Sequence, residues 1–318
     1  MELITADDVR AAETRLQDQV VRTPLTAGPP EGPPFLLKPE SLQPTGAFKL
    51  RGATNAVALL GSAQRRTGVV THSSGNHGQA LAYAAARYRV PCTVVVPEGA
   101  PKIKVDRMRA FGARLVMVPP EEREATAREL EAGEGLTLVP PFDDPHVIAG
   151  QGTVGLEILE QSPEVTTIVV PVGGGGLASG VATAARTVRP HRVRVVGVEP
   201  ELAADAAESL RTGELVTWPP ERTHRTMADG VRVCLCERTF AHLRERLDEV
   251  VTVTEEEIGH AVAALAHGSR LVAEPSGALA AAAILAGRVA TTPGRPGETV
   301  AVVSGGNVDP ELFVRLVS

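Results

Sequence analysis

The stretch VVPVGGGGLASG, which runs from Val169 to Gly180, places a β-branched run directly before four glycines and a helical pattern of small residues. Glycine permits positive φ angles and lets a ligand approach the backbone amides closely. Those amides, together with the positive end of the helix dipole, form a site that suits a phosphate. Because a tight turn between a strand and a helix needs fewer glycines, the run predicts a phosphate-binding loop.

The same stretch leaves more than one kind of phosphate ligand to consider. Gly173, Gly175 and Ala178 satisfy the degenerate G-x-G-x-x-A pattern, and Glu199 ends the next predicted strand. A dinucleotide site of the NAD type therefore stays open. The chain contains no G-x-x-x-x-G-K-[ST] sequence, which excludes a P-loop nucleotide site.

Strand-like apolar runs alternate with alanine-rich helical patterns along most of the chain. This alternation predicts parallel sheets with both faces covered by helices. The predicted strands are Val69–His72, Thr93–Val96, Leu115–Val118, Thr167–Val172, Val193–Val198, Val250–Val253 and Thr299–Val303, and helices are predicted to begin at Gly78, Lys102 and Glu121. The composition suggests that residues 54–141 form a small α/β domain, inserted into a larger domain made of residues 1–53 and 142–318.

Several boundaries carry local signals. The N-terminal stretch MELITADDVRAAE reads as a capped helix, and Thr254 to Glu257 fits a capping box. Pro275 should end one helix, and the alanine run after Gly277 should begin another. The segments rich in proline and glycine are predicted to be surface loops, and they are Thr26–Pro34 and Thr291–Gly297.

Charge and composition exclude several classes of protein. The net charge is −6, from 32 basic and 38 acidic residues, and no cationic stripe indicates a nucleic-acid partner. No apolar run approaches the roughly 18–20 residues that cross a bilayer, and the acidic N-terminus does not resemble a signal peptide. The three cysteines, Cys92, Cys234 and Cys236, are interpreted as reduced thiols, which favours a cytoplasmic protein.

A second ligand-binding loop is predicted in THSSGNHGQALAYAAA, from Thr71 to Ala86, which again runs from strand to polar turn to helix. The free amides at the start of a helix suit a carboxylate. Capping alone requires one polar residue, whereas this turn contains four polar side chains and a glycine: Ser73, Ser74, Gly75, Asn76 and His77.

Lys49 is the remaining chemical signal, because it opens an apolar helical pattern in ESLQPTGAFKLRGATN, from Glu40 to Asn55. A desolvated lysine has a lowered pKa and can form a Schiff base with an aldehyde. Near the C-terminus, Ser304 lies at the tip of an apolar strand, where parallel sheets present ligand-binding groups. A phosphate loop, a carboxylate loop and an activated amine together suggest pyridoxal phosphate, whereas NAD chemistry needs no such lysine.

With these residues in view, the chain resembles the fold-type II pyridoxal-phosphate enzymes, specifically the threonine dehydratase and serine racemase group. The resemblance implies a fold like the tryptophan synthase β-subunit, with two open, twisted, mostly parallel α/β sheets and the cofactor between the domains. The motifs that carry it follow in the family's order from Pro44 to Asn307, and they are PTGAFKLRGA, SSGNHGQA, PVGGGGL, MADGV, VAEPSGA and SGGN.

The resemblance implies a role for each matching position. Lys49 resembles the Schiff-base lysine that also takes the Cα proton, and Ser74 resembles a second acid–base group on the opposite cofactor face. Asn76 resembles the partner of the cofactor 3-hydroxyl, and Ser304 that of the pyridine nitrogen. The other implied cofactor contacts are Phe48, Glu274 and the phosphate cradle Gly173, Gly174, Gly175, Gly176 and Leu177, and the implied substrate-carboxylate clamp is Ser73, Gly75, Asn76 and His77.

The family also implies a divalent cation bound after a strand by a glutamate, a backbone carbonyl and an aspartate. Glu199, Ala203 and Asp205 stand at the matching positions, and oxygen ligands favour magnesium or calcium. Solvated acids with no metal are the alternative interpretation of the two carboxylates.

The chain departs from the family pattern at a few positions. Ala47 replaces a serine that usually precedes the lysine, and Val233 stands where serine racemases have serine. An apolar residue there suits the methyl group of threonine. Ser74 favours the racemase, because many threonine dehydratases have alanine there. Nucleotide activation is not predicted from Pro44 and Thr45, and the lack of room after Ser318 for a regulatory domain suggests a catabolic or single-domain form.

The predicted activity is the β-elimination of L-threonine and L-serine to 2-oxobutanoate or pyruvate and ammonia, by a homodimer. A serine hydroxyl beside the pyridine nitrogen favours expulsion of the β-hydroxyl over a long-lived carbanion. A serine racemase, or an enzyme with both activities, is the first alternative, and a β-hydroxyaspartate dehydratase that uses Arg232 is another. An NAD-dependent dehydrogenase and a non-catalytic sensor are the alternatives from other classes.

Overall fold

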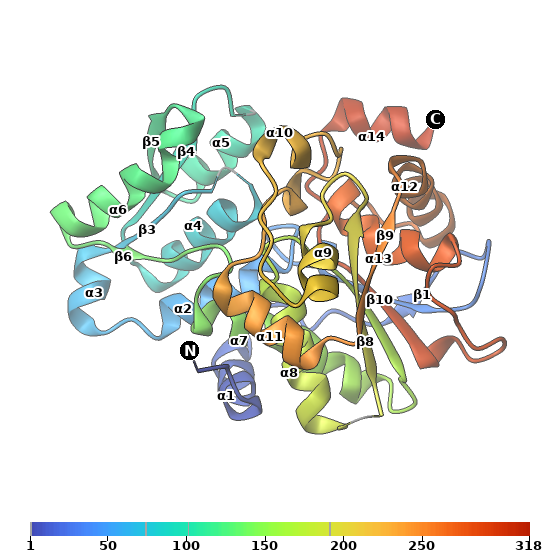
Figure 1. Cartoon of the computed structure of the whole chain (residues 1–318). Coiled ribbons are helices and arrows are strands. Elements are labelled where there is room, and N and C mark those ends of the chain that lie inside the picture. The colour runs from blue at the N-terminus through green and yellow to red at the C-terminus, as the bar shows by residue number, and fades with distance from the viewer. Residues whose placement is uncertain (1, 74, 101, 191) are drawn as a thin grey trace.

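The computed structural model describes residues 2–73, 75–100, 102–190 and 192–318. Two β-sheets organise the chain, and helices flank each of them (Figure 1). The strands of the smaller sheet belong to the blue-green part of the ribbon on the left, and the larger sheet combines strands from both ends of the chain.

The larger sheet has six strands in the order β1-β2-β10-β7-β8-β9. All neighbours pair in parallel except β1 and β2, which are antiparallel. Since the carboxyl ends of parallel strands share one edge, the segments that follow β7, β8 and β10 meet at that edge. The strands are β1 (Thr26–Ala27), β2 (Leu36–Pro39), β7 (Thr167–Pro171), β8 (Arg194–Pro200), β9 (Glu249–Val253) and β10 (Thr299–Val303).

The smaller sheet has four parallel strands in the order β5-β4-β3-β6. Its central strands are buried along nearly their whole length, as expected for a sheet covered by helices on both faces. The strands are β3 (Val69–Thr71), β4 (Cys92–Pro97), β5 (Arg114–Val118) and β6 (Thr137–Leu138).

Helices connect and cover these strands. Helix α13 packs on β10 and β7, while α2 packs against both α4 and α7. The α-helices are α1 (Ala6–Leu16), α2 (Lys49–Ala58), α3 (Ser62–Thr67), α4 (Asn76–Tyr88), α5 (Lys102–Ala110), α6 (Arg123–Glu134), α7 (Pro145–Gln161), α8 (Gly176–Val188), α9 (Asp205–Thr212), α10 (Pro220–Thr223), α11 (Glu237–Arg246), α12 (Glu255–Ser269), α13 (Pro275–Leu285) and α14 (Pro310–Val317). The 3₁₀ turns are η1 (Glu40–Leu42), η2 (Pro120–Glu122), η3 (Asp229–Val231) and η4 (Pro296–Glu298).

The fold class predicted from the sequence is confirmed, and each predicted strand is present. The capping box at the start of α12 is also present, because Thr254 and Glu257 each accept a backbone amide hydrogen bond from the other. The N-terminal helix α1 begins with the same arrangement between Thr5 and Asp8.

Two boundary predictions are wrong. Helix α12 ends at Ser269, where Arg270 takes a left-handed conformation, and Pro275 instead occupies the first position of α13. Proline is well suited to that position because its missing amide would have no helical partner there. The segment Thr26–Pro34, predicted to be a loop, contains strand β1, which pairs with β2. This strand has only two residues, which is too short for an alternation of apolar and polar residues to reveal it.

The division into an inserted domain of residues 54–141 and a larger domain stays a proposal. Helix α2 runs through its first boundary, so the chain passes from one unit to the other inside a helix. The hydrophobic cluster that holds the start of α2 also includes residues of α4 and β4.

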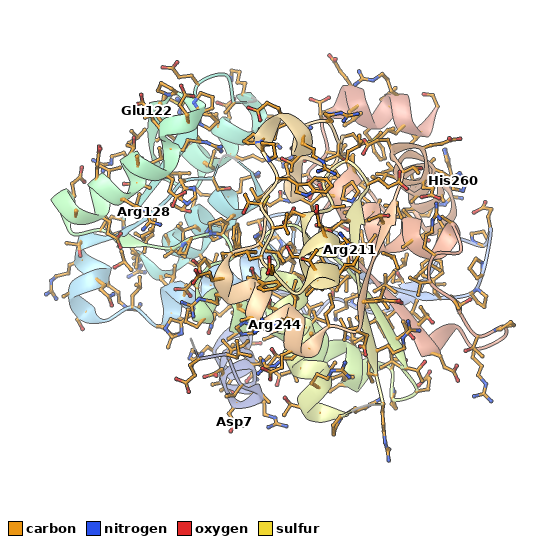
Figure 2. All side chains as sticks on the ribbon, in the orientation of Figure 1. Asp7, Glu122, Arg128, Arg211, Arg244 and His260 are labelled. Atoms are coloured by element: carbon orange, nitrogen blue, oxygen red, sulfur yellow. The ribbon has the colours of Figure 1, made fainter. Side chains whose placement is uncertain are left out.

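Ionisable side chains are spread over both halves of the molecule. Figure 2 labels Glu122 and Arg128 beside the smaller sheet, and Arg211, Arg244 and His260 on helices of the larger half. Among the helices in the described part of the chain, none combines the length and hydrophobicity that a bilayer crossing requires.

Candidate active site

Lys49 is the first residue of α2 and is half-buried at the start of that helix. Its ammonium Nζ donates a hydrogen bond of 2.6 Å to the carbonyl oxygen of Pro141. No carboxylate in the described part of the chain lies within ion-pair distance of it. Burial therefore lowers the pKa of Lys49 to about 8, which makes the neutral, nucleophilic amine accessible near neutral pH.

The glycine loop follows β7 and leads into α8. Gly175 caps the helix with φ of 82°, a conformation that glycine adopts without strain. Among the described residues, no acceptor is hydrogen-bonded to the backbone amides of Gly173–Leu177. These amides lie at a helix start, so they can hold an anion.

Phe142 packs against the glycine loop. A Cβ atom built on Gly174 would lie 2.3 Å from Cδ1 of the Phe142 ring, and one on Gly176 would lie 3.0 Å from Cβ of Phe142. Phe142 directly follows Pro141, whose carbonyl accepts the Lys49 hydrogen bond. This short segment thus connects the amine and the anion-binding loop.

Asn76 begins α4, next to the tip of β3, and joins that helix to the larger sheet. Its side-chain Nδ2 donates to Oε1 of Glu274 at 2.6 Å, and its Oδ1 accepts from Nδ2 of Asn307 at 2.8 Å. An amide nitrogen carries two hydrogens, so one donor of Asn76 remains for a ligand.

His77 is buried in the first turn of α4, where its Nε2 lies 2.9 Å from the carbonyl oxygen of Val139. Burial, with a smaller contribution from the nearby charge of Lys49, lowers the pKa of His77 to about 3. The neutral ring must donate through Nε2 to that carbonyl, so Nδ1 has only a lone pair to offer. A carboxylate would consequently be bound by the backbone amide of His77 rather than by its ring.

Glu274 is buried directly before α13, with one oxygen on Asn76. Burial raises the pKa of Glu274 to about 7, and the negative charge of Asp229 adds to this effect. The carboxyl group can therefore exchange a proton near neutral pH while it holds the Asn76 amide in place.

Ser304 follows β10, and its backbone carbonyl accepts a hydrogen bond of 3.0 Å from the amide of Phe48. The Ser304 hydroxyl makes a long contact of 3.4 Å with the carbonyl oxygen of Ser276. Such a contact is weak, so the hydroxyl is free to turn toward a ligand. The residue before Lys49 is thus fixed to the strand tip that carries Ser304.

The four residues of the predicted substrate-carboxylate clamp, Ser73, Gly75, Asn76 and His77, lie at or directly before the start of α4. Gly75 caps α4, and its amide donates to the hydroxyl of Ser73 at 3.3 Å. Ser74, the predicted second acid–base group, lies outside the described residues. Asn76 and His77, the other members of the clamp, are the first two residues of α4, and their role stays a prediction.

The predicted metal ligands lie after β8. The carboxylate of Glu199 accepts from the amides of Ala206 and Ala207 at 3.1 and 2.7 Å, and Asp205 accepts from the amide of Leu235 at 3.1 Å. Burial raises the pKa of Glu199 well above its usual value, and the charge of Asp205 adds to the rise.

This donor set fits a hard cation. Both carboxylates are buried, and within the described residues neither has a basic partner and no donor reaches the carbonyl oxygen of Ala203. No group of three or more His, Cys, Asp or Glu side chains is arranged for a metal in the described chain. A cation would therefore depend on two carboxylates and that carbonyl, which suits magnesium or calcium.

We expect magnesium or calcium to raise the thermal unfolding midpoint of the wild-type protein by about 5 °C at saturation. Glu199→Gln should abolish the shift, because the amide cannot offset the cation's charge. Glu201→Gln, which removes an exposed acid nearby, is the control and should retain it. Equal shifts in the wild-type and Glu199→Gln proteins would place the cation elsewhere.

Sequence reasoning missed several residues of this site. Pro141, Phe142 and Val139 contact predicted site residues although none carries an obvious chemical signal. Asn307, the last residue of the SGGN motif, was assigned no role but bonds to Asn76. The run PPFDDP was the available clue, because its last two residues, Asp144 and Pro145, form the N-cap and first position of α7.

Comparison with known proteins places these features in context. The family model described as "Pyridoxal-phosphate dependent enzyme" matches residues 16–305. An L-threonine ammonia-lyase from Geobacter sulfurreducens is 44% identical over 95% of this chain and 75% of its own length. A serine racemase from Arabidopsis thaliana is 40% identical over 95% of this chain and 92% of its own length. An L-threo-3-hydroxyaspartate ammonia-lyase from Saccharomyces cerevisiae is 39% identical over 99% of this chain and 96% of its own length.

Solved structures show the same similarity. A threonine deaminase from T.th. superposes with a TM-score of 0.88 at 42% identity, covering 96% of this chain and 99% of the other. Maize serine racemase superposes with a TM-score of 0.92 at 36% identity, covering 99% of this chain and 97% of the other.

Proposed function

Because this chain belongs to the pyridoxal-phosphate-dependent enzymes, we propose that it is an ammonia-lyase that converts L-threonine and L-serine into a 2-keto acid and ammonia. The observation that carries the proposal is the half-buried Lys49 amine, which has a pKa lowered to about 8 by burial. It lies beside a segment that also packs on the glycine loop. A lysine in such surroundings is suited to bond an aldehyde and then to accept a proton.

The described residues fit the cofactor. The free amides of the glycine loop and the start of α8 suit its phosphate. The spare donor of Asn76 suits its 3-hydroxyl, and the weakly held hydroxyl of Ser304 suits its ring nitrogen. Phe48 adjoins Lys49, with its ring centroid 5.1 Å from Nζ.

When bound, pyridoxal phosphate supplies an aldehyde that captures the substrate amine and a conjugated ring that accepts electron density from Cα. Lys49 Nζ then removes the Cα proton. The backbone amides at the start of α4, which belong to Asn76 and His77, hold the substrate carboxylate. Overall, threonine loses its α-hydrogen and β-hydroxyl as water, and water then releases ammonia to leave 2-oxobutanoate.

The side-chain end of the substrate is the basis for the choice of threonine and serine. Arg232 donates through Nε and Nη2 to the carbonyl oxygen of Thr226, at 3.1 and 2.5 Å. Two of the five N–H donors of the guanidinium are thus already engaged and fix its orientation, which disfavours its use for the second carboxylate of hydroxyaspartate. Val233 is apolar and half exposed, which suits a methyl group better than a charge.

A serine racemase is the second candidate, and the observation that favours it is the identity of residue 74. A racemase needs a proton donor on the face opposite Lys49, and Ser74 carries a hydroxyl at the matching position of the family motif. Both activities share every proposed cofactor contact, so the products must separate them.

The test is to incubate the reconstituted enzyme with L-threonine, L-serine and L-threo-3-hydroxyaspartate and to measure keto acid, ammonia and the D-amino acid. We expect equimolar keto acid and ammonia, with kcat/KM highest for threonine. D-Serine as the main product would establish the racemase instead. Preference for hydroxyaspartate would refute the argument from Arg232.

We also propose a homodimer located in the cytoplasm, which light scattering and cell fractionation would test. Support for the compartment comes from the cysteines, because Cys92, Cys234 and Cys236 are all free. Support for the dimer comes from the expectation for this fold.

A further inference from the structure

A cluster of four charged side chains is buried behind the lysine-bearing helix. Lys38 comes from β2, Glu40 from η1, Arg51 from α2 and Glu157 from α7. The first three are fully buried and Glu157 is nearly so. The cluster has no net charge, and no element of the proposed function uses it.

Arg51 is the centre of this cluster. Its Nε and Nη2 donate to the two oxygens of Glu40 at 2.7 and 2.8 Å, and its Nη1 and Nη2 donate to those of Glu157 at 2.7 and 2.9 Å. The carboxylates of Glu40 and Glu157 therefore each bind the Arg51 guanidinium through two hydrogen bonds in fork geometry. This fixes the plane of the guanidinium as well as its position. Nη1 also donates to Thr153 Oγ1 at 3.1 Å.

The remaining groups complete the cluster without involving the active site. Lys38 Nζ donates to Glu157 at 2.6 Å and to Gln161 at 3.0 Å, while Glu40 accepts from Thr23 at 2.7 Å. Breaking such an arrangement on one side leaves an uncompensated buried charge, so these groups move little relative to one another.

Arg51 lies two residues after Lys49 and therefore about 200° around the helix axis from it. The Lys49 side chain reaches Pro141, whereas Arg51 holds the other side of the same turn to η1 and α7. In addition, the amide of Phe48 bonds to the carbonyl of Ser304. The first turn of α2 is thus anchored on both sides of Lys49.

The effect of Arg51 on Lys49 is geometric. Burial alone accounts for the lowered pKa of Lys49, and the positive charge of Arg51 is balanced by the carboxylates of Glu40 and Glu157. The charge of Arg51 in turn holds the pKa of Glu40 below its usual value, against the opposing effect of burial.

We propose that Arg51, gripped by Glu40 and Glu157, is a positioning residue that sets the direction in which Lys49 enters the active site. The proposal rests on the proposed role of Lys49 as the cofactor-binding amine. It predicts that loosening Arg51 reduces the share of bound cofactor that is linked to Lys49, while the glycine loop still binds the phosphate.

The test compares two charge-balanced double variants of the full chain. Arg51→Met/Glu40→Gln removes the anchor, whereas Arg186→Met/Asp248→Asn removes an arginine–carboxylate pair between α8 and the residue before β9 and leaves both partners of Arg51 in place. The readouts are the lysine-linked cofactor fraction from the near-visible absorbance, kcat and KM, and hydrogen exchange of residues 47–52 in the cofactor-free protein. We expect the first variant to lose roughly 10- to 100-fold in kcat with little change in KM, because misplacing a reacting group by about 1 Å has that cost.

The control variant should stay within about threefold of wild type in kcat, with unchanged exchange at residues 47–52. Equal losses in both variants, or wild-type exchange and absorbance in the first, would overturn the proposal. If the first variant does not fold, Arg51→Lys replaces it, since lysine keeps the charge but not the fork. Wild-type kcat, absorbance and exchange in Arg51→Lys would likewise overturn the proposal. Hydrogen exchange of residues 47–52 does not depend on any activity, so this measurement tests the role of Arg51 even if the proposed function is wrong.

Discussion

Lys49→Ala should abolish the near-visible absorbance of the reconstituted protein and lower keto-acid formation by at least about 10⁴-fold, as expected when a covalent and proton-transferring group is removed. The physical reason is that alanine offers neither an amine for the aldehyde nor a base for the Cα proton. Absorbance spectra and single-turnover assays with L-threonine measure the two effects separately.

The matched control for this variant is Lys102→Ala, which makes the same chemical change at an exposed lysine of α5. We expect the control to bind cofactor and turn over like the wild type. If Lys49→Ala kept its absorbance, another amine would hold the cofactor, and the role assigned to Lys49 would be wrong.

Gly174→Ala should weaken the binding of pyridoxal phosphate by roughly 10- to 100-fold, which corresponds to about 1–3 kcal/mol of overpacking. The added Cβ would lie 2.3 Å from the Phe142 ring, so the loop or the ring must move. Equilibrium titration of the cofactor-free protein, followed by fluorescence, measures the change in affinity.

Two further variants test the cause of that loss. Gly133→Ala places a methyl group on α6 where no neighbouring atom lies within 4 Å, and it should leave the affinity unchanged. Adding Phe142→Ala to Gly174→Ala should recover part of the affinity, because it removes the clashing ring. Wild-type affinity in Gly174→Ala alone would show that the loop does not bind the phosphate.

The strands and the loops that follow them could be predicted because their signals are local. The β-branched run before Gly173 and the apolar run before Ser304 each specify a buried strand, and parallel strands present their tips at a common edge. The glycine run and the polar turn before Asn76 could therefore be assigned to ligand binding before their positions in space were known.

The contacts between these loops could not be predicted, because they depend on long-range packing. Pro141 reaches Lys49 across 92 residues of sequence, and Glu274 reaches Asn76 across 198. Neither pair has a spacing that sequence periodicity can reveal. The neutral state of the His77 ring likewise follows from burial, and the position of the Val139 carbonyl determines which ring nitrogen carries the hydrogen.

The buried charges around Arg51 show the same limit. The sequence places Arg51 in an apolar helical pattern, where a solvated charge is the ordinary expectation. Its two carboxylate partners lie 11 residues before it and 106 residues after it. Their convergence is a consequence of how η1, α2 and α7 pack, which the helical pattern alone does not specify.

The most direct test of the account is to reduce the cofactor-loaded protein with borohydride, digest it and locate the modified residue by mass spectrometry. Reduction converts the bond between amine and cofactor into a stable link, so the peptide that contains the reacting lysine gains the mass of the reduced cofactor. We predict that the added mass lies on Lys49, with Lys38 and Lys104 unmodified. A modification on a different lysine, or none in a protein that forms keto acid, would contradict the account.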